Sequence, residues 1–306
     1  MSNRKCIDDG SYLKLLFQMK IVYALIILAL FSCTRKETLE DRVNAITKDK
    51  KLKAGVAVLD MQTGELTEVN GREDFPLQSV FKFHIAAKVL DDVDRGKLRL
   101  EEPVTMEASE ILENTWSPLR DNLGNKDMSL RLDSLIGYMV SLSDNNACDI
   151  LLRRIGGPQA VNDYIHSLGI SGTQIQVNEE EMHRDWEAQF RNVATPASVV
   201  EALKKFYMRE FLSGHMHDFL WAQMANSPTG KKRLRGGVPE DATVAHKTGT
   251  SGRNGEGLAA ATNDAGVIIL PDGRVYVAAV FITDSYESDE VNEKVIADIA
   301  RSITNP

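Results

Sequence analysis

The pattern of apolar and polar residues predicts helices at both ends and in the middle of the chain. The clearest helix begins at Ser79 and ends at Gly96, because apolar residues recur between them every three or four positions. Further helices are expected over residues 39–50, 129–141, 145–156, 197–225 and 286–303. Residues 172–195 are polar and aperiodic, which predicts a long loop and makes this segment a functional candidate.

Two groups of segments have the composition of β-strands. The stretch "AGVAVLDMQTGELTEVNG" predicts two strands around a turn at Thr63 and Gly64. Near the C-terminus, "ATVAHKTGT", "GLAAATNDAGVIIL" and "RVYVAAVFITD" predict three more. We therefore expect a two-lobed α/β fold. Residues 34–76 and 232–306 build an α/β lobe, with an antiparallel sheet flanked by helices, and residues 77–231 build an all-α lobe. A ligand is expected between the lobes.

Residues 1–33 are predicted to direct export. Residues 21–31 form an unbroken apolar run, which is shorter than the roughly 20 residues that a membrane-spanning helix needs. Lys20 precedes the run and "LFSC" ends it, as in a secretory signal whose Cys33 is lipidated. Simple cleavage and an uncleaved anchor are the alternatives. A signal of normal length begins at Met19, so we hypothesise that translation starts there. The expected location is periplasmic, with lipid on Cys33 as the link to an envelope membrane.

Charge and cysteine content exclude several kinds of partner. The net charge of −8 and the pI of about 5.4 argue against nucleic acid, whose phosphates need a basic face. Cys148 is the one cysteine beyond residue 33, so no disulfide within the chain is expected. His215 and His217 would point about 200° apart on a helix and could not bind one ion together. We expect a monomer without a metal or cofactor.

Ser79 and Lys82 are a candidate nucleophile and activator. The same S-x-x-K pattern occurs at Ser2 and Ser11, but there it lies in the segment predicted to be removed or not translated. At the start of a helix, Lys82 lies one turn after Ser79 on the same face, and its ammonium would favour the alkoxide. The helix N-terminus adds a positive end. Taken alone, the pair is better explained by a serine N-cap followed by a solvated lysine.

Two later motifs extend this candidate site. Ser143-Asp144-Asn145 could protonate a leaving nitrogen through its serine and hold a substrate amide through its asparagine. Its alternative role is a helix cap. Lys247-Thr248-Gly249, followed by Thr250, lies on a predicted strand, where it could receive a carboxylate. Its alternative reading is a polar strand end.

The three motifs occur in this order in an exported chain, and residues 39–306 therefore resemble the serine penicillin-recognising family. That family contains the class A β-lactamases and the penicillin-binding proteins. The resemblance implies that Ser79 is the acylated nucleophile and that Lys82 activates it. It also implies that Ser143 passes a proton to the β-lactam nitrogen.

The resemblance also implies how a β-lactam would be bound. Asn145 would hold the amide of the substrate side chain. The backbone N–H groups of Ser79 and Thr250 would form an oxyanion hole, a device worth about 10²–10³ in rate per donor. The region of the substrate carboxylate would lie against the strand motif, which consists of Lys247, Thr248, Gly249 and Thr250.

The long loop bears on whether the acylated serine is released, because a hydrolase needs a second base. Residues 179–181 are three glutamates, which alone are typical of a solvated charge run. Class A β-lactamases carry their water-activating glutamate in such a loop, with an amide side chain four residues later. The resemblance therefore implies Glu179 as the deacylation base, with Glu180 as the alternative register, and His183 as the residue that positions the water. His183, "SDNNACDIL" and "SVFKFH" are similar to the Bacteroides-type cephalosporinases and related extended-spectrum enzymes.

Three more residues refine the expected site. Val177 stands where many class members have an arginine that pins the loop, so we expect a more open loop that admits bulky cephalosporin side chains. Arg233 is expected to reinforce the carboxylate site, with a surface cation as the alternative. Trp116 is expected to line the site mouth, with ordinary packing as the alternative.

The predicted function is hydrolysis of the β-lactam amide of cephalosporins and penicillins through a serine acyl-enzyme, which confers antibiotic resistance. The enzyme alternative is a D-Ala-D-Ala carboxypeptidase or transpeptidase. The non-enzyme alternative is a β-lactam sensor that stays acylated. A glutamate in the loop argues against both, because neither needs a base for rapid deacylation.

Overall fold

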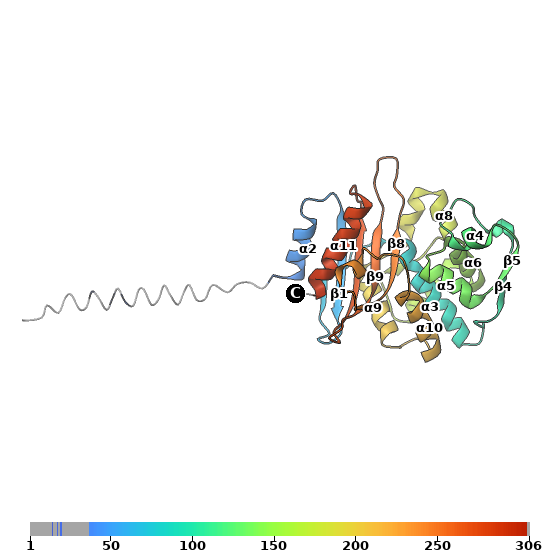
Figure 1. The fold of residues 1–306 in the computed structure, drawn as a ribbon, viewed down its shortest axis with the longest axis horizontal. Helices are drawn as coiled ribbons and strands as arrows, with labels where there is room; N and C mark the ends of the chain where they lie inside the picture. The colour runs from blue at the N-terminus through green and yellow to red at the C-terminus, as the bar shows by residue number, and fades with distance from the viewer. Residues whose placement is uncertain (1–13, 15–16, 18, 20–36, 305–306) are drawn as a thin grey trace, which may run out of the picture. The chain divides into compact units, whose positions relative to one another are not determined.

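An antiparallel sheet forms the centre of the fold that begins at Leu39 (Figure 1). The computed structural model describes residues 37–304, together with Lys14, Phe17 and Met19. Within the described residues the sheet has five strands in the order β2-β1-β10-β9-β8. Their bounds are β1 Lys53–Asp60, β2 Leu66–Val69, β8 Thr243–Thr250, β9 Thr262–Ile269 and β10 Val275–Thr283. The middle strands are apolar on both faces, which requires cover on both sides.

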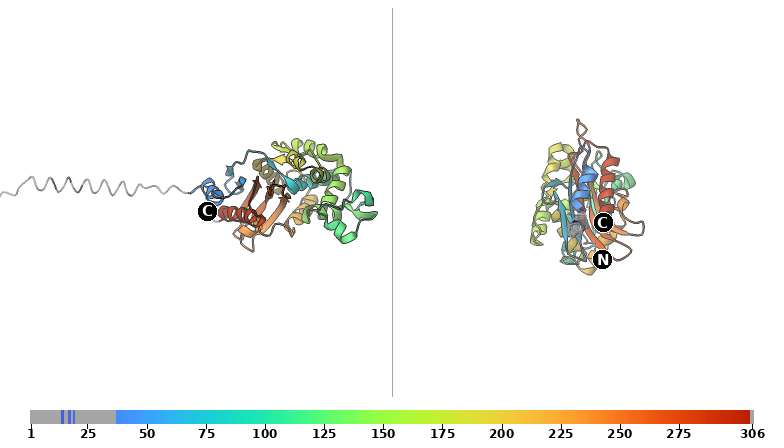
Figure 2. Two further views of the ribbon diagram at one scale, coloured as in Figure 1. Left: turned by 90° about the horizontal axis from the view of Figure 1, so that it is seen from above. Right: turned by 90° about the vertical axis from the view of Figure 1, so that its left-hand side faces the viewer.

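Helices cover the two faces of the sheet (Figure 2). Helices α2 (Leu39–Thr47) and α11 (Asp289–Thr304) pack on one face, where they meet Val56 and Val58 of β1. Helices α9 (Pro196–Tyr207) and α10 (Gly214–Ala225) pack on the other, where Ala57 and Leu59 belong to the larger core. Successive side chains of a strand point to opposite faces, so β1 contributes to both cores.

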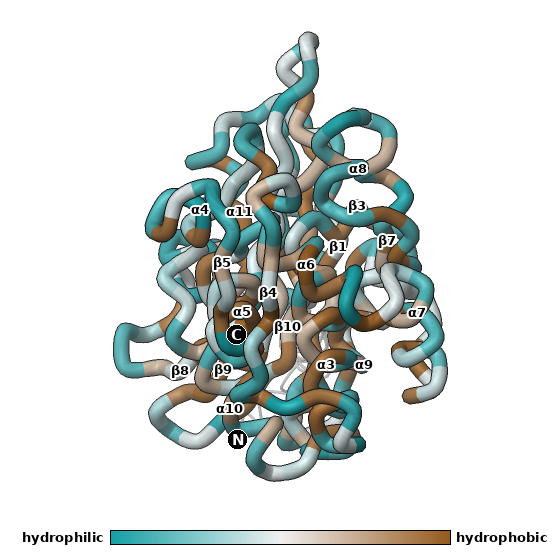
Figure 3. Tube along the Cα trace, turned by 90° about the vertical axis from the view of Figure 1, so that its right-hand side faces the viewer, coloured by the Kyte–Doolittle hydropathy of each residue, from teal (hydrophilic) through white to brown (hydrophobic). Residues whose placement is uncertain are grey.

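Several helices surround α3, which is buried over most of its length. Helix α3 (Phe81–Asp94) packs against α5, α6, α7 and α10, and the hydropathy colouring of Figure 3 shows apolar residues on these elements. The helices of this part of the fold are α4 Pro118–Leu123, α5 Leu132–Ser141, α6 Asn145–Ile155, α7 Gly157–Ser167 and α8 Glu179–Arg184, and α4 and α8 pack against α6. A serine placed at the start of α3 is therefore attached to a rigid element.

Short strands and 3₁₀ turns connect these helices. Strands β3 (Phe75–Pro76), β7 (Val193–Ala194) and β6 (Thr173–Gln174) form a small sheet that joins the segment before Ser79 to both ends of the long loop. Strands β4 and β5 form a second pair. The other bounds are β4 Pro103–Met106, β5 Met128–Arg131, η1 Gln78–Val80, η2 Ala108–Glu110, η3 Trp186–Arg191 and η4 Leu234–Gly237.

The predicted order of helices and strands is confirmed, with local errors. Residues 197–225 are not one helix: α9 ends at Tyr207 and α10 begins at Gly214, and Arg209 between them has a left-handed φ of 60°. The helix predicted from residue 129 begins at Leu132, because Met128–Arg131 pairs with β4. Helices α4, α7 and α8 were not predicted, and α8 lies within the segment predicted to be a loop. Pro158 lies in the first turn of α7, so the glycine–proline sequence that ends α6 also begins α7.

The division into two lobes stays an interpretation. The sheet strands come from both ends of the described chain and most helices from its middle, as predicted. Helix α9, assigned to the all-α lobe, lies against β1, β9 and β10. The predictions on the export segment, including lipidation of Cys33 and the motifs at Ser2 and Ser11, fall on residues outside the described part. Within that part, no helix is long and apolar enough to cross a membrane.

Candidate active site

Ser79 was predicted to begin the helix, and it lies in the 3₁₀ turn η1, immediately before α3 begins at Phe81. The residue before it, Gln78, has a left-handed φ of 45°, which is costly for a residue with a side chain. Its amide donates to the Gln189 side chain at 2.6 Å, and the backbone N–H of Leu77 donates to the Asn192 carbonyl at 2.8 Å. Contacts from the long loop therefore hold the turn that presents the nucleophile.

Lys82 is the hub of the site and is fully buried. Its ammonium lies 2.9 Å from the Ser79 hydroxyl and 2.8 Å from a Glu179 carboxylate oxygen. It also contacts the Ser143 carbonyl at 2.8 Å and the Asn145 side-chain oxygen at 2.5 Å. An ammonium has three hydrogens, so four acceptors compete for it. Four residues therefore converge on the Lys82 nitrogen: Ser79, Ser143, Asn145 and Glu179.

The S-D-N turn brings both Ser143 and Asn145 into contact with this lysine. Ser143 has a left-handed φ of 60°, and its hydroxyl accepts from Lys247 at 2.9 Å. Asp144 is buried and caps α6 by accepting from the Ala147 N–H at 2.8 Å. Burial raises the pKa of the Asp144 carboxyl, against the hydrogen bonds that lower it. The motif is thus a helix cap, as the alternative reading had it, and also carries two site residues.

Strand β8 passes so close to the nucleophile turn that only glycine fits at position 249. A Cβ on Gly249 would lie 2.5 Å from the Leu77 carbonyl oxygen and 3.3 Å from the Ser79 nitrogen. Close approach of two backbones is a common reason for glycine within a strand. It brings Gly249, the residue before Thr250, next to the backbone of Ser79, and an oxyanion hole formed by Ser79 and Thr250 would require such an approach.

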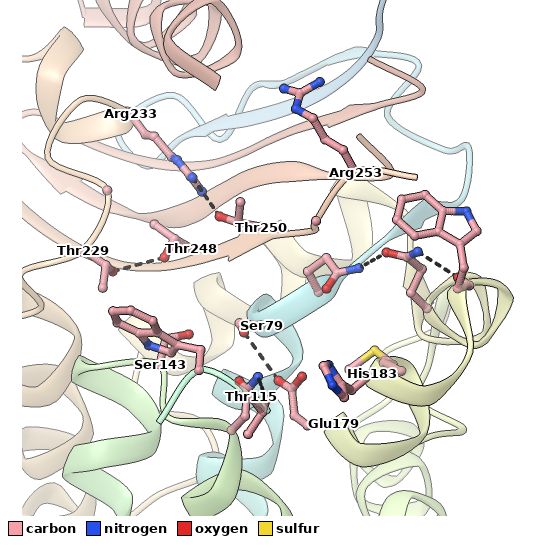
Figure 4. Close-up of a pocket in the computed structure, with 18 residues that line it drawn as sticks. Ser79, Thr115, Ser143, Glu179, His183, Thr229, Arg233, Thr248, Thr250 and Arg253 are labelled. Carbon is pink, nitrogen blue, oxygen red and sulfur yellow. Dashed lines mark hydrogen bonds between the residues drawn. The ribbon is translucent and has the colours of Figure 1, made fainter. Parts of the chain in front are cut away.

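The side chains around Gly249 form a polar wall. Lys247 is buried, and burial, followed by the nearby Lys82 charge, lowers its pKa well below the usual value. The Thr248 hydroxyl lies 3.1 Å from the Thr229 hydroxyl. Arg233 is buried, so it is not the surface cation of the alternative reading. It donates to the Thr250 hydroxyl at 2.8 Å (Figure 4). It also donates to the Gly249 carbonyl at 3.0 Å.

Glu179 begins α8 and points at Ser79, with a carboxylate–hydroxyl distance of 3.5 Å (Figure 4). Glu180 instead pairs with Arg184 at the surface, so the first register is the one that faces Lys82. His183 lies four residues on and lines the same cavity. Residues Glu179, Met182 and His183 share one face of this short helix. The helix lies within residues 172–195, which were predicted to be a loop without periodicity.

Asp149, which sequence reasoning missed, anchors the start of α8. Its carboxylate accepts from the backbone N–H of Glu179 at 2.8 Å and of Glu180 at 2.9 Å. Burial, reinforced by the charge of Glu179, raises the pKa of Asp149 to about 7. Cys148 beside it is fully buried, and burial raises its pKa well above the usual value, as expected for an unreactive thiol.

The loop is held without an arginine at position 177. Val177 is fully buried, and its backbone is bound by Asn192. The Asn192 side-chain oxygen accepts from the N–H groups of Gln176 and Val177 at 2.8 and 3.0 Å, and its amide donates to the Val177 carbonyl at 2.9 Å. Hydrogen bonds from the Asn192 side chain therefore hold the loop at the position where many class members have an arginine. Whether this leaves the loop more open than in other class members stays a prediction.

These elements enclose a cavity of about 510 Å³. The predicted residues that line it are Ser79, Trp116, Ser143, Asn145, Glu179, His183, Arg233, Thr248 and Thr250. Lys82, Lys247 and Gly249 are buried and contact that lining. Trp116 is 62% exposed, which excludes ordinary core packing.

Other lining residues were missed by the sequence reasoning: Gln78, Thr115, Met182, Trp186, Gln189 and Thr229. Gln78 and Thr115 adjoin residues that were predicted, so proximity in sequence was the available signal for them. Thr229 and Gln189 are brought in by the tertiary fold.

No metal-binding group is found among the described residues. Clusters of three or more His, Cys, Asp or Glu side chains that could hold an ion do not occur in this part of the chain. His217 is buried on α10, stacks near Trp221 and contacts the Asp218 carboxylate at 3.0 Å, whereas His215 is exposed.

Comparisons with known proteins agree with this site. The profile of the β-lactamase enzyme family matches residues 38–306. A β-lactamase from Bacteroides uniformis is 42% identical over 289 residues, which cover 92% of this chain and 97% of that protein. The crystal structure of the TLA-1 extended-spectrum β-lactamase superposes with a TM-score of 0.85 and 43% identity, covering 87% of this chain and 96% of that one. A class A β-lactamase from Bacteroides cellulosilyticus superposes with a TM-score of 0.82 and 40% identity, covering 86% and 94%.

The fold and the serine–lysine–glutamate centre are those of a serine hydrolase that opens cyclic amides. The chain belongs to the β-lactamase enzyme family, as a member of class A. Hydrolysis of β-lactams, and the antibiotic resistance that it confers, are therefore its function. These relatives give no support to the carboxypeptidase or sensor alternatives.

Proposed function

We propose that this enzyme acylates on Ser79 and is deacylated by a water molecule that Glu179 deprotonates. The observation that carries the proposal is the position of the Lys82 ammonium, 2.9 Å from the Ser79 hydroxyl and 2.8 Å from the Glu179 carboxylate. A nucleophile within reach of two groups that can take its proton fits general-base activation. Either Glu179 can be the base for acylation, or Lys82 can be once its ammonium has given a proton to Glu179, which lies 2.8 Å away. Only Glu179 is assigned to deacylation.

The acylation step balances with the groups at the site. The Ser79 oxygen bonds to the β-lactam carbonyl carbon, its proton passes to the base, and the negative charge develops on the carbonyl oxygen. That oxyanion is assigned to the backbone N–H groups of Ser79 and Thr250, which the glycine at position 249 allows to lie close together. The C–N bond then breaks, the nitrogen takes the proton of Ser143, and the proton that the base took from Ser79 replaces it on Ser143.

Deacylation returns the enzyme to its starting state. Glu179 takes a proton from water, the resulting hydroxide attacks the ester carbon, and the Ser79 oxygen leaves and is reprotonated. His183 is proposed to orient this water, since it lines the same cavity one helical turn after Glu179. A penicillin-binding enzyme lacks such a second base and stays acylated.

Substrate binding is assigned to the polar wall and to the S-D-N turn. The substrate carboxylate would lie against Lys247, Thr248 and Thr250, with Arg233 behind them, because buried cations favour an anion that arrives to pair with them. Asn145 would bind the amide of the acylamino side chain. We propose cephalosporins with bulky side chains as the preferred class, supported by the cavity of about 510 Å³ and by the relatives named extended-spectrum.

We also propose a monomeric, exported enzyme whose Cys33 carries lipid. The support is the apolar run of residues 21–31 and the cysteine that ends it. Radiolabelled palmitate should enter the full-length protein in cells but not the Cys33→Ala variant. Labelling of both would contradict the assignment. Light scattering on the soluble body checks the monomer.

The test of the mechanism is intact mass against time, with residues 34–306 and a small excess of a cephalosporin. The parent enzyme should show an adduct that disappears as the drug is consumed. Glu179→Gln should retain the adduct, since deacylation loses its base, and Ser79→Ala should form none. Glu180→Gln is the matched control and should behave as the parent, because Glu180 pairs with Arg184 away from the serine. Rapid turnover by Glu179→Gln would refute the role of Glu179.

A further inference from the structure

The rim of the cavity on the helical side is a segment without regular structure. Residues 112–117 lie between η2 and α4. The Thr115 hydroxyl accepts from the Asn145 amide at 2.8 Å, and the Trp116 carbonyl accepts from the Asn145 N–H at 3.0 Å. The Trp116 indole N–H donates to the Leu142 carbonyl at 2.9 Å. The rim thus contacts the residue proposed to bind the substrate amide.

The two ends of the rim are held by the S-D-N turn and its neighbour. Leu112 exchanges two hydrogen bonds with the Asn146 side chain, at 2.9 and 3.1 Å. At the other end, the Ser117 hydroxyl lies 2.9 and 3.1 Å from the two oxygens of Asp144. Backbone groups between these ends have no helix or strand to satisfy them and need another partner.

Arg120 supplies that partner. One nitrogen of its guanidinium donates to the carbonyls of Leu112 and Thr115, each at 3.0 Å, and to the carbonyl of Glu113. Its other two nitrogens donate to Asp121 at 3.1 and 2.7 Å. The side chain is only 20% exposed. Three carbonyls of the rim are therefore directed inward, onto one cation.

We infer that Arg120 is a positioning residue for the acylamino side chain of the substrate. By fixing the carbonyls of Glu113 and Thr115, it sets where the Thr115 hydroxyl and the Trp116 indole face the cavity. Lysine would not reproduce this, because a guanidinium presents several donors in one plane and an ammonium is a point charge. The inference rests on the proposed binding of the substrate amide at Asn145.

Two substrates separate this role from a general loss of structure. Benzylpenicillin carries an acylamino side chain, whereas aminopenicillanic acid, the bare nucleus, has none. In Arg120→Gln, KM for benzylpenicillin should rise about tenfold while its kcat changes less than threefold. The rise in KM for aminopenicillanic acid should be several times smaller. An equal rise in KM for both substrates, or no rise for either, overturns the inference.

Arg131→Gln is the matched control. Arg131 lies just before helix α5, whereas Arg120 lies within α4. Like Arg120, it pairs with an acid nearby in sequence, here Asp133, but it contacts no carbonyl of the rim. This variant should have the same KM and kcat as the parent for both substrates. If the parent hydrolysed neither substrate, the proposed function would be wrong. If the parent hydrolysed both and Arg120→Gln changed KM equally for both, only the role of Arg120 would be overturned.

Two further readouts do not depend on the glutamine variant folding well. Guanidinium ion at low millimolar concentration should restore the KM for benzylpenicillin in Arg120→Ala, because it can fill the vacated site. Acrylamide quenching, with the signal of Trp116 obtained by difference from Trp116→Phe, should show a more accessible indole in Arg120→Ala. No rescue together with unchanged quenching would overturn the inference.

Discussion

At the scale of single residues, the site is governed by buried charges that lie within reach of one another. Lys82, Glu179 and Asp149 are all buried, and each is satisfied by partners from other elements. A buried charge is tolerable only when it is paired and hydrogen-bonded. Asp149 has two backbone N–H donors but also lies near the negative Glu179, and its pKa is raised to about 7. It therefore fixes the glutamate at an electrostatic cost.

Asp149→Asn should slow deacylation. An asparagine offers one oxygen where the carboxylate offers two, so either the N–H of Glu179 or that of Glu180 would face an amide donor. The first turn of α8 would then be held less firmly, and Glu179 would be misplaced. We therefore expect kcat to fall about tenfold or more. Rapid-quench mass spectrometry should show the acyl-enzyme accumulating. Asp185→Asn, an exposed cap in the same loop, is the control. A fall in the acylation rate instead would contradict this role.

At the scale of secondary-structure elements, the site depends on strand β8 pressing against the turn η1. The glycine at position 249 is required by contact with the Leu77 carbonyl, not by an unusual φ, because it lies within a regular strand. Its sequence neighbours Lys247 and Thr250 are thereby carried to the serine. The strand and the nucleophile turn, which are far apart in the sequence, become one wall.

Gly249→Ala should impair acylation far more than Gly252→Ala. The added methyl at position 249 would lie 2.5 Å from a backbone oxygen, so the strand or the turn must shift and separate the proposed oxyanion-hole donors. Loss of one such donor costs about 10²–10³ in rate. At Gly252, two residues along, an added Cβ meets nothing within 4 Å. Stopped-flow acylation rates compare the variants. Equal rates would show that the close approach is not needed for catalysis.

Elements with a local signal were predictable, and the partners that hold them in place were not. The spacing of Ser79 and Lys82, the cap at Asp144 and the glycine at 249 are each visible within a few residues of sequence. Asp149, Asn192 and Arg120 act on segments far along the chain or through backbone carbonyls, which leave no mark on residue type. The break between α9 and α10 was missed for a different reason: apolar spacing continues across residues 208–213 although the backbone turns.

At the scale of the whole molecule, α3 carries the catalytic lysine through the middle of the larger core, and it carries a second ionisable group there. His84 is buried beside Phe83, and no partner for its Nε2 atom is found in the described part of the chain. Burial lowers the pKa of His84 from 6.5 to about 4. The folded enzyme therefore keeps this imidazole neutral where the unfolded chain protonates it.

The enzyme should lose stability as the pH falls from about 6.5 to about 4, and His84 should account for a defined part of that loss. Between these pH values the unfolded chain binds a proton that the folded chain refuses, so the free energy of unfolding decreases. The shift from 6.5 to about 4 corresponds to about 3 kcal/mol, reached near pH 4. His84→Leu should lose about that much less between pH 7 and pH 4 in urea titrations. His166→Gln, an exposed histidine on α7, should follow the parent. If the free energy of unfolding fell equally between pH 7 and pH 4 in the parent and in His84→Leu, the buried imidazole would not be what limits stability in acid.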